Sequence, residues 1–231
     1  VSDCTGKCAE GHFCAEGSTT SEAAKCGHAS RYCPPGAKTW NAVTVGYFST
    51  PVDAEKNTRS GESQCTTGYY CKNGEINACG NEKTIPTRWY CPDDGMSEPK
   101  AMDPGFYGDG SIDGSNTTLT LALACEEGYF CANGERKECG GPGLYCPKMS
   151  SSPGSVKVGW YSTGGAPSTR AGEAECPVGH FCSGGLKSKC PEGSYGDTPQ
   201  FHKPSCSGPC REGYWCGQGS ISPTEHTCGE G

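Results

Sequence analysis

The chain has 231 residues, of which 33% are apolar with cysteine included, and its formal net charge is −7. Ordinary globular chains are nearly half apolar, so hydrophobic burial alone cannot offset the entropy of ordering this chain. The acidic balance, without any basic run, argues against nucleic acid or an anionic membrane as a partner. The longest apolar stretch, Leu119–Ala124, is far shorter than the roughly 20 residues of a membrane-spanning helix.

Twenty cysteines indicate an oxidising compartment, so we expect an extracellular or cell-surface protein stabilised by disulfides. Structural zinc sites usually carry Cys-x2-Cys pairs, and this sequence has none; its closest spacings are Cys4-x3-Cys8 and Cys206-x3-Cys210. The prediction is therefore no metal and no cofactor. No signal peptide begins at Val1, so we expect a mature form or an excised part of something longer.

Five Cys-x5-Cys pairs recur along the chain, each with Gly in the third place of the interval and an aromatic residue or His next. Such self-similarity is typical of an array of small modules. A third cysteine follows each pair, and most copies have a fourth, then a Gly-aromatic element. The pairs are Cys8/Cys14, Cys65/Cys71, Cys125/Cys131, Cys176/Cys182 and Cys210/Cys216. The predicted modules are 1–64, 65–124, 125–175, a short one at 176–209, and an incomplete one at 210–231.

The Gly-aromatic elements TVGYFST (44–50) and KVGWYST (157–163) alternate β-forming residues around a glycine and predict short two-stranded ribbons. The alternation in Thr117–Ala124 favours another strand, and no stretch has a sustained helical period. In each adjacent aromatic pair, such as Tyr47 and Phe48, one ring is expected to face inward and the other outward. The predicted fold class is a small disulfide-rich protein, an elongated tandem array with short β-ribbons and mostly irregular structure.

Four cysteines in a module allow three connectivities, and sequence alone does not choose among them. We predict the common interlocked arrangement, first to third and second to fourth. The predicted pairs are Cys8–Cys26, Cys14–Cys33, Cys65–Cys79, Cys71–Cys91, Cys125–Cys139, Cys131–Cys146, Cys176–Cys190, Cys182–Cys206 and Cys210–Cys228.

Cys4 and Cys216 are left over by this scheme. The N-terminal SDCTGKCAEGHFC matches PSCSGPCREGYWC near the C-terminus, so the chain repeats its own beginning. By that repeat, each leftover cysteine is expected to link beyond the chain, as in a segment of a longer array. The alternatives are that the two pair with each other or stay as free thiols.

The stretches CEEGYFCANGERKECGGPGLYCP and CPVGHFCSGGLKSKCPEGSYGDTP resemble ephrin-receptor-like cysteine-rich repeats. Those repeats occur in large extracellular proteins of protists, algae and animals. CPEGSYG…CSGPC is similar to modules of tumour-necrosis-factor receptors and of growth-factor-receptor cysteine-rich regions. The resemblance covers nearly the whole chain and implies elongated rods of disulfide-bonded modules without catalytic residues. Some such proteins build surface coats or the mastigonemes of flagella.

Residues that could carry chemistry are few. His12 and His180 occupy the slot that Tyr fills in other modules, which predicts a packing role. No hydrolase, metalloprotease or phosphate-loop motif is present, and we predict that the protein is not an enzyme. Asp109–Gly114 mimics the start of an EF-hand loop, but Thr120 stands where a bidentate Glu is needed, so we expect a surface turn there.

Asn116 begins the only Asn-x-Ser/Thr sequence and is predicted to carry an N-linked glycan. Together these observations predict a non-enzymatic extracellular structural protein, part of a repeat array that builds a surface coat or filament by self-association. Neighbouring modules of a longer chain and glycans are the other expected partners. The alternative is the ligand-binding ectodomain of a surface receptor or adhesin.

Overall fold

Short antiparallel strand pairs make up the regular structure of this chain. The computed structural model describes residues 6–80, 89–109 and 118–229. Within these ranges every strand has two to four residues, and no helix is present. High glycine and proline content favours turns over long elements, which accounts for the short strands. The predicted fold class, a disulfide-rich tandem array with short β-ribbons, is confirmed.

The repeating element is a hairpin that we call a rung, and most of the described rungs begin with a tight turn that has glycine in its third place. At Thr66–Tyr69 the turn closes through a hydrogen bond from Tyr69 N to Thr66 O of 3.0 Å. Gly68 has a φ of 86°, as the third position of a type II turn requires. The chain continues into β7 (Tyr69–Lys72) and returns through β8 (Glu75–Ala78).

Three kinds of rung recur along the chain, and they differ in their cysteines. First-kind rungs, which carry Cys-x5-Cys, are β7–β8, β1 (His12–Phe13) with β2 (Ala24–Lys25), β13 (Tyr129–Ala132) with β14 (Glu135–Glu138), β19 (His180–Ser183) with β20 (Leu186–Lys189), and β23 (Tyr214–Trp215) with β24 (His226–Thr227). Second-kind rungs, which hold the later cysteines, are β3 (Arg31–Tyr32) with β4 (Asn41–Ala42), β9 (Trp89–Tyr90) with β10 (Lys100–Ala101), β15 (Leu144–Tyr145) with β16 (Gly154–Ser155), and β21 (Ser194–Tyr195) with β22 (Gly208–Pro209). Third-kind rungs, which have a serine in place of the cysteine, are β5 (Tyr47–Thr50) with β6 (Gly61–Gln64) and β17 (Trp160–Thr163) with β18 (Gly172–Glu175). The pair of β11 (Phe106–Gly108) and β12 (Ala122–Ala124) has glycine, Gly108, at that position.

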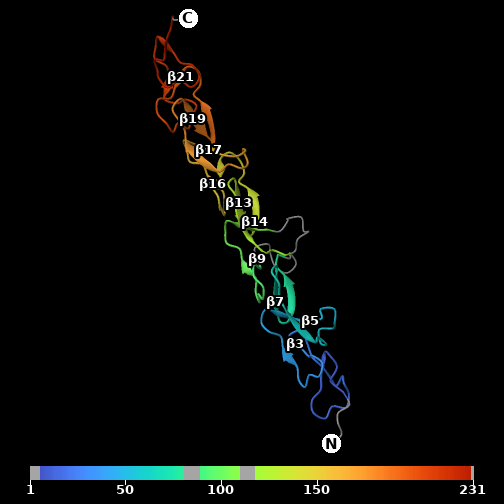
Figure 1. Ribbon diagram of the computed structural model, residues 1–231. Helices are drawn as coiled ribbons and strands as arrows, with labels where there is room; N and C mark the ends of the chain where they lie inside the picture. The colour runs from blue at the N-terminus through green and yellow to red at the C-terminus, as the bar shows by residue number, and fades with distance from the viewer. Residues whose placement is uncertain (1–5, 81–88, 110–117, 230–231) are drawn as a thin grey trace. The chain divides into compact units, whose positions relative to one another are not determined.

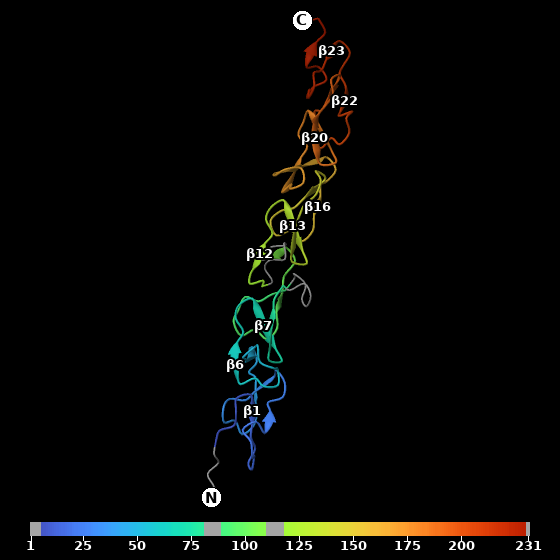
Figure 2. The same cartoon turned by 90° about the vertical axis from the view of Figure 1, so that its right-hand side faces the viewer.

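The chain divides into two compact units, Val1–Met102 with Gly108–Leu123, and Asp103–Tyr107 with Ala124–Gly231. It passes from one unit to the other within β11 (Phe106–Gly108) and β12 (Ala122–Ala124). Inside each unit the rungs follow one another in chain order, as β3, β5 and β7 do in unit 1 (Figure 1). The view turned by 90° has the same order within unit 2, from β13 through β20 to β23 (Figure 2).

Backbone hydrogen bonds join each rung to the next. Gly11 N donates to Cys33 O of the following rung at 2.9 Å, and Cys26 N donates back to Gly11 O at 3.0 Å. The same pair of bonds recurs at Gly68, Gly128, Gly179 and Gly193. Because both bonds use only backbone atoms, the contact between rungs tolerates the variation in the side chains around it.

The core of the array consists mainly of cystine. Eleven of the twelve largest fully buried side chains are cysteines, and the twelfth is Ser49. Ser49 and Ser162 lie at the cysteine position of the third-kind rungs and are 0% and 5% exposed. Each hydroxyl donates to a turn carbonyl of the following rung, Gly74 O at 3.3 Å and Gly185 O at 3.2 Å. A hydrogen bond to the next rung therefore replaces the disulfide in these two places.

The aromatic pairs do not divide into one buried and one exposed ring. Both aromatic residues of β5, of β11 and of β17 are half-buried. A two-stranded ribbon between neighbouring rungs has no deep interior on either face, so neither ring is fully covered. The fully buried position of β5 and β17 is the small serine that follows the pair.

Candidate functional site

The disulfides join nearest neighbours in sequence, which corrects the interlocked pairing predicted above, from Cys8–Cys26 to Cys210–Cys228. The observed bonds are Cys8–Cys14, Cys26–Cys33, Cys65–Cys71, Cys79–Cys91, Cys125–Cys131, Cys139–Cys146, Cys176–Cys182, Cys190–Cys206 and Cys210–Cys216. Each bond therefore closes one rung, and no observed bond joins one rung to another.

The entry turn is the physical reason for this pairing. The left-handed glycine at Gly68 folds the five-residue interval back on itself, so Cys65 and Cys71 face each other with a Cα–Cα distance of 5.8 Å. That separation lies within the range that a disulfide spans. Cys79 begins the next rung, where its backbone N donates to Gly68 O, so it bonds Cys91 of its own rung instead.

The terminal cysteines also differ from prediction. Cys216, expected to link beyond the chain, is bonded to Cys210, whereas Cys228 is a free and exposed thiol. Cys4 and the predicted glycosylation site Asn116 lie outside the described residues.

In the rung that begins at Cys190, the disulfide partner lies further along the chain than in the other rungs, and the sequence indicates why. Gly196 stands six residues after Cys190, where a cysteine closes most other rungs. A side chain there would place a Cβ 2.8 Å from Cys190 Sγ. The partner comes instead from Cys206, 16 residues along the chain.

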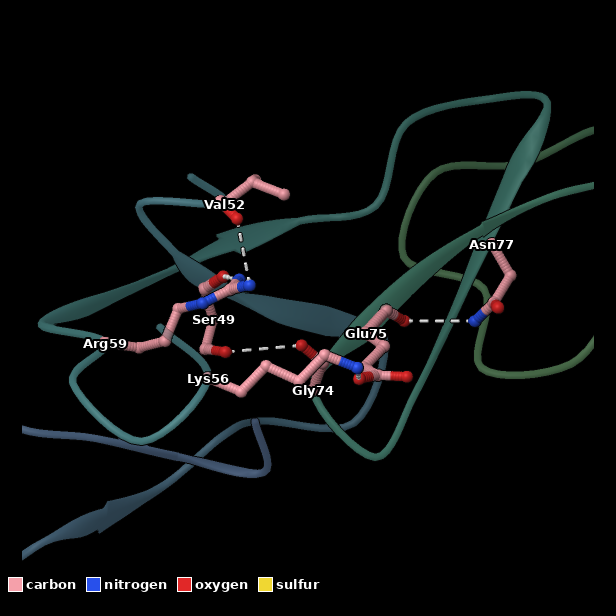
Figure 3. A network of polar contacts seen from close by, with 7 residues as sticks. All are labelled: Ser49, Val52, Lys56, Arg59, Gly74, Glu75 and Asn77. Carbon is pink, nitrogen blue, oxygen red and sulfur yellow. Dashed lines mark hydrogen bonds and ion pairs between the residues drawn. The ribbon is translucent and has the colours of Figure 1, made fainter. Parts of the chain in front are cut away.

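A buried arginine organises the long loop of the first third-kind rung (Figure 3). Arg59 is 6% exposed and donates through its guanidinium to the carbonyl oxygens of Ser49 and Val52. Next to it, Ser49 Oγ donates to Gly74 O, which joins β5 to the following rung. Sequence reasoning missed Arg59. The signal that could have found it is a repeated arginine: Arg170 stands at the same place in the other third-kind rung and donates to two glycine carbonyls of its own loop.

A hollow of about 480 Å³ opens on unit 1 beside β3, β5 and the turn after β7. Its lining includes Trp40, whose ring lies 3.9 Å from the Arg31 guanidinium carbon, and an ion pair between Lys72 and Glu98 of 3.2 Å. Val45 adds an apolar side chain that is 80% exposed. An aromatic ring, an arginine and an apolar tip together can contact a ligand that has both polar and apolar faces.

In the third-kind rung of β17 and β18, one carboxylate binds the segment that leads into the first strand. Glu173, with a side chain 8% exposed, accepts hydrogen bonds from Lys157 N at 3.0 Å and Tyr145 OH at 3.5 Å, and pairs with Lys157 Nζ at 2.6 Å. Burial alone would raise the pKa of Glu173, but these hydrogen bonds and the lysine charge outweigh it and lower the pKa. Glu62 holds the equivalent place in the first such rung, where it accepts from Thr44 N at 2.7 Å and Oγ1 at 2.9 Å.

The segment that resembles an EF-hand loop uses its first carboxylate for local structure. Asp109 accepts hydrogen bonds from Thr120 N, Thr120 Oγ1 and Leu121 N at 3.0, 2.6 and 3.1 Å. Partial burial opposes ionisation, but these hydrogen bonds prevail and lower the pKa of Asp109. Ser111, Asp113 and Gly114 lie outside the described residues.

The two repeated histidines have the same local contact. His12 Nδ1 lies 3.1 Å from Glu10 O, and His180 Nδ1 lies 3.1 Å from Val178 O. Across residues 6–80, 89–109 and 118–229, no group of three or more His, Cys, Asp or Glu side chains has an arrangement suited to a metal ion. In the same ranges, no helical segment has the length and apolar character needed to cross a bilayer.

No known family model matches the chain, and a search of curated proteins found no matching relative. What is known of the fold and the environment of this protein therefore comes from its own sequence and structure. The density of disulfides places it in an oxidising extracellular or secretory environment.

Proposed function

We propose that this protein is a non-enzymatic structural protein of the cell exterior, whose rungs form part of a larger surface coat or filament. The observation that carries the proposal is the repeated backbone contact between rungs. Stability in such an array is roughly the sum of terms within repeats and between neighbours, so length can grow without redesign of a central core.

The close approach of the rungs supports the same proposal. A Cβ at Gly159 would lie 2.5 Å from Gln200 O, and one at Gly105 would lie 3.0 Å from the Met149 carbonyl carbon. Each of these contacts joins a rung to the next but one in the chain, so such spacing leaves little internal freedom within three successive rungs. Resistance to deformation is a requirement of a coat or filament more than of a flexible binding module.

Electron microscopy of the native material without reducing agent, alongside its mass in solution, tests this proposal. Filaments or sheets with a regular repeat are the expected result. Isolated particles with the mass of a single chain would contradict a structural role.

The hollow beside Trp40 favours a second candidate, a ligand-binding ectodomain. Under this alternative, a ligand that enters the hollow would perturb the Arg31–Trp40 contact. Titration of the chain with candidate glycans and peptides, monitored by the NMR signals of the Trp40 ring, tests it. A Trp40→Ala variant provides the control, since it should abolish specific binding and leave the disulfides intact.

A further inference from the structure

The hollow beside β3 and β5 lies on a backbone scaffold that occurs once in each unit. In unit 1, Ser49 N donates to Gly74 O of the following rung at 3.0 Å. In unit 2, Ser162 N donates to Gly185 O at 2.9 Å. The strand pair before each of these rungs also has the same register, two residues against two. Each unit is therefore a reference for what the scaffold of the other requires.

Two side chains of the hollow have no counterpart of their kind in unit 2. Arg31 corresponds by strand register to Leu144, and Trp40 corresponds to Pro153. The backbone bonds between the rungs form in unit 2 without an arginine or a tryptophan at these positions. The packing of the rungs therefore does not account for Arg31 and Trp40.

Arg31 supplies a positive charge that no carboxylate neutralises. Its guanidinium carbon lies 3.9 Å from the centre of the Trp40 ring, and within the described part of the chain its side chain has no ion pair and donates no hydrogen bond. Stacking on a ring leaves the in-plane N–H groups of a guanidinium able to bind a carboxylate. Lys72, by contrast, pairs with Glu98 at 3.2 Å. The hollow thus has a net positive charge in a chain of net charge −7.

Neutral polar groups and an aromatic surface complete the lining. The Asn73 amide and the Ser97 hydroxyl both line the hollow, and among the described residues neither side chain has a hydrogen-bond partner. Trp40 is 39% exposed and Val45 is 80% exposed. The volume of about 480 Å³ lies in the range of small-molecule sites, about 300–1,000 Å³.

We propose that this hollow binds an acidic saccharide and recognises a sugar ring that has a carboxylate. One face of such a ring presents C–H groups, which pack on the negative face of an aromatic ring such as Trp40. The hydroxyls at the rim of the sugar bind Asn73 and Ser97, and the carboxylate accepts two hydrogen bonds from Arg31. An acidic peptide offers the carboxylate but not the C–H face with hydroxyls around it. This inference rests on the second candidate function, ligand binding, and names its ligand class.

Calorimetric titration of the oxidised chain with tetragalacturonate tests the inference. The methyl ester of the same tetrasaccharide retains the rings and hydroxyls and lacks the negative charges. Tetragalacturonate should bind and shift the indole N–H signal of Trp40 in an NMR spectrum. The ester should bind about tenfold more weakly, because hydrogen bonds to a charged group are the stronger ones. Added salt should weaken binding of the acid more than binding of the ester.

Two variants separate the charge from the aromatic surface. Arg31→Leu introduces the residue that unit 2 has, and should lower the affinity for the acid to that for the ester while leaving the ester unaffected. Trp40→Ala should abolish binding of both. Lys187→Leu is the matched control, because it removes another cation stacked on a ring, 4.6 Å from the centre of Tyr161, and should bind both ligands as the unmodified chain does. Equal losses for acid and ester in Arg31→Leu would contradict carboxylate recognition and leave Arg31 a structural role.

Three further results would overturn the inference, and they bear differently on the ligand-binding function. Equal affinity of the unmodified chain for acid and ester would reject recognition of the carboxylate. Binding of tetraglutamate as tight as that of tetragalacturonate would show that charge alone is recognised and would reject the saccharide. A Trp40 signal that other glycans or peptides shift and tetragalacturonate does not would reject this ligand class and leave the ligand-binding function in place. Microscopy of the native material tests the structural function separately.

Discussion

Alanine substitution of each of two adjacent glycines distinguishes the cost of backbone strain from the cost of disturbing the packing of one rung on another. Gly184 and Gly185 form the turn between β19 and β20, with φ values of 59° and 79°. A Cβ on Gly184 meets nothing within 4 Å. A Cβ on Gly185 would lie 2.5 Å from the Pro142 carbonyl carbon and 2.9 Å from Gly143 Cα, where about 3.5–4.0 Å is normal. Both substitutions strain the backbone, and only the second obstructs another rung, that of β15 and β16.

The expected costs follow from these geometries. Gly184→Ala should cost about 1–2 kcal/mol, the usual penalty for alanine in a left-handed conformation. Gly185→Ala carries the same penalty and also displaces the turn that accepts Ser162 N at 2.9 Å. The loss of a buried backbone hydrogen bond adds about 1–3 kcal/mol, so the total is about 2–5 kcal/mol. The effect of alanine on the unfolded chain is the same in both variants and cancels in the comparison.

Amide hydrogen exchange at Ser162, with all disulfides intact, measures this difference locally. Exchange protection should fall about tenfold for each 1.4 kcal/mol lost. Gly185→Ala should therefore expose the Ser162 amide much more than Gly184→Ala does. Equal loss of protection in the two variants would refute the packing argument, because strain alone would then explain both.

Three further predictions concern the disulfides and the hydrogen-bonded carboxylate of Glu173. Trypsin without reducing agent should release Glu138–Lys148 as a separate peptide, two hydrogens lighter than its reduced form; a peptide linked to another would restore the interlocked pairing. Val156→Cys with Ser162→Cys should form a further disulfide that adds about 2 kcal/mol, because these positions match the cysteines of the other rungs; two more free thiols than the unmodified chain has, in a titration with a thiol reagent, would contradict that equivalence. The lowered pKa of Glu173 stabilises the fold above the unfolded pKa of about 4.3, and this contribution is lost as pH falls through the lower folded pKa. Glu173→Gln should therefore make the free energy of unfolding less dependent on pH in that acid range. An unchanged pH profile would show that Glu173 is not a source of acid sensitivity.

Cysteine spacing and composition predicted much of this structure from the sequence alone. A chain with so few apolar residues must use covalent cross-links, so disulfides and short ribbons followed directly. The repeated glycine in Cys-x5-Cys also marked the start of every first-kind rung. That signal is local, because a turn depends on a few adjacent residues and needs no distant partner.

Only the tertiary structure decided how the cysteines pair and what joins the rungs. Cys65 is close in sequence to several cysteines, and the turn at Gly68 selects among them by bringing Cys71 opposite. The role of Ser162 at a cysteine position was likewise invisible in the sequence, because its partner, Gly185, belongs to another rung. Spacing along the chain determined which residues form a rung, and the approach of one rung to the next depended on backbone atoms that every residue shares.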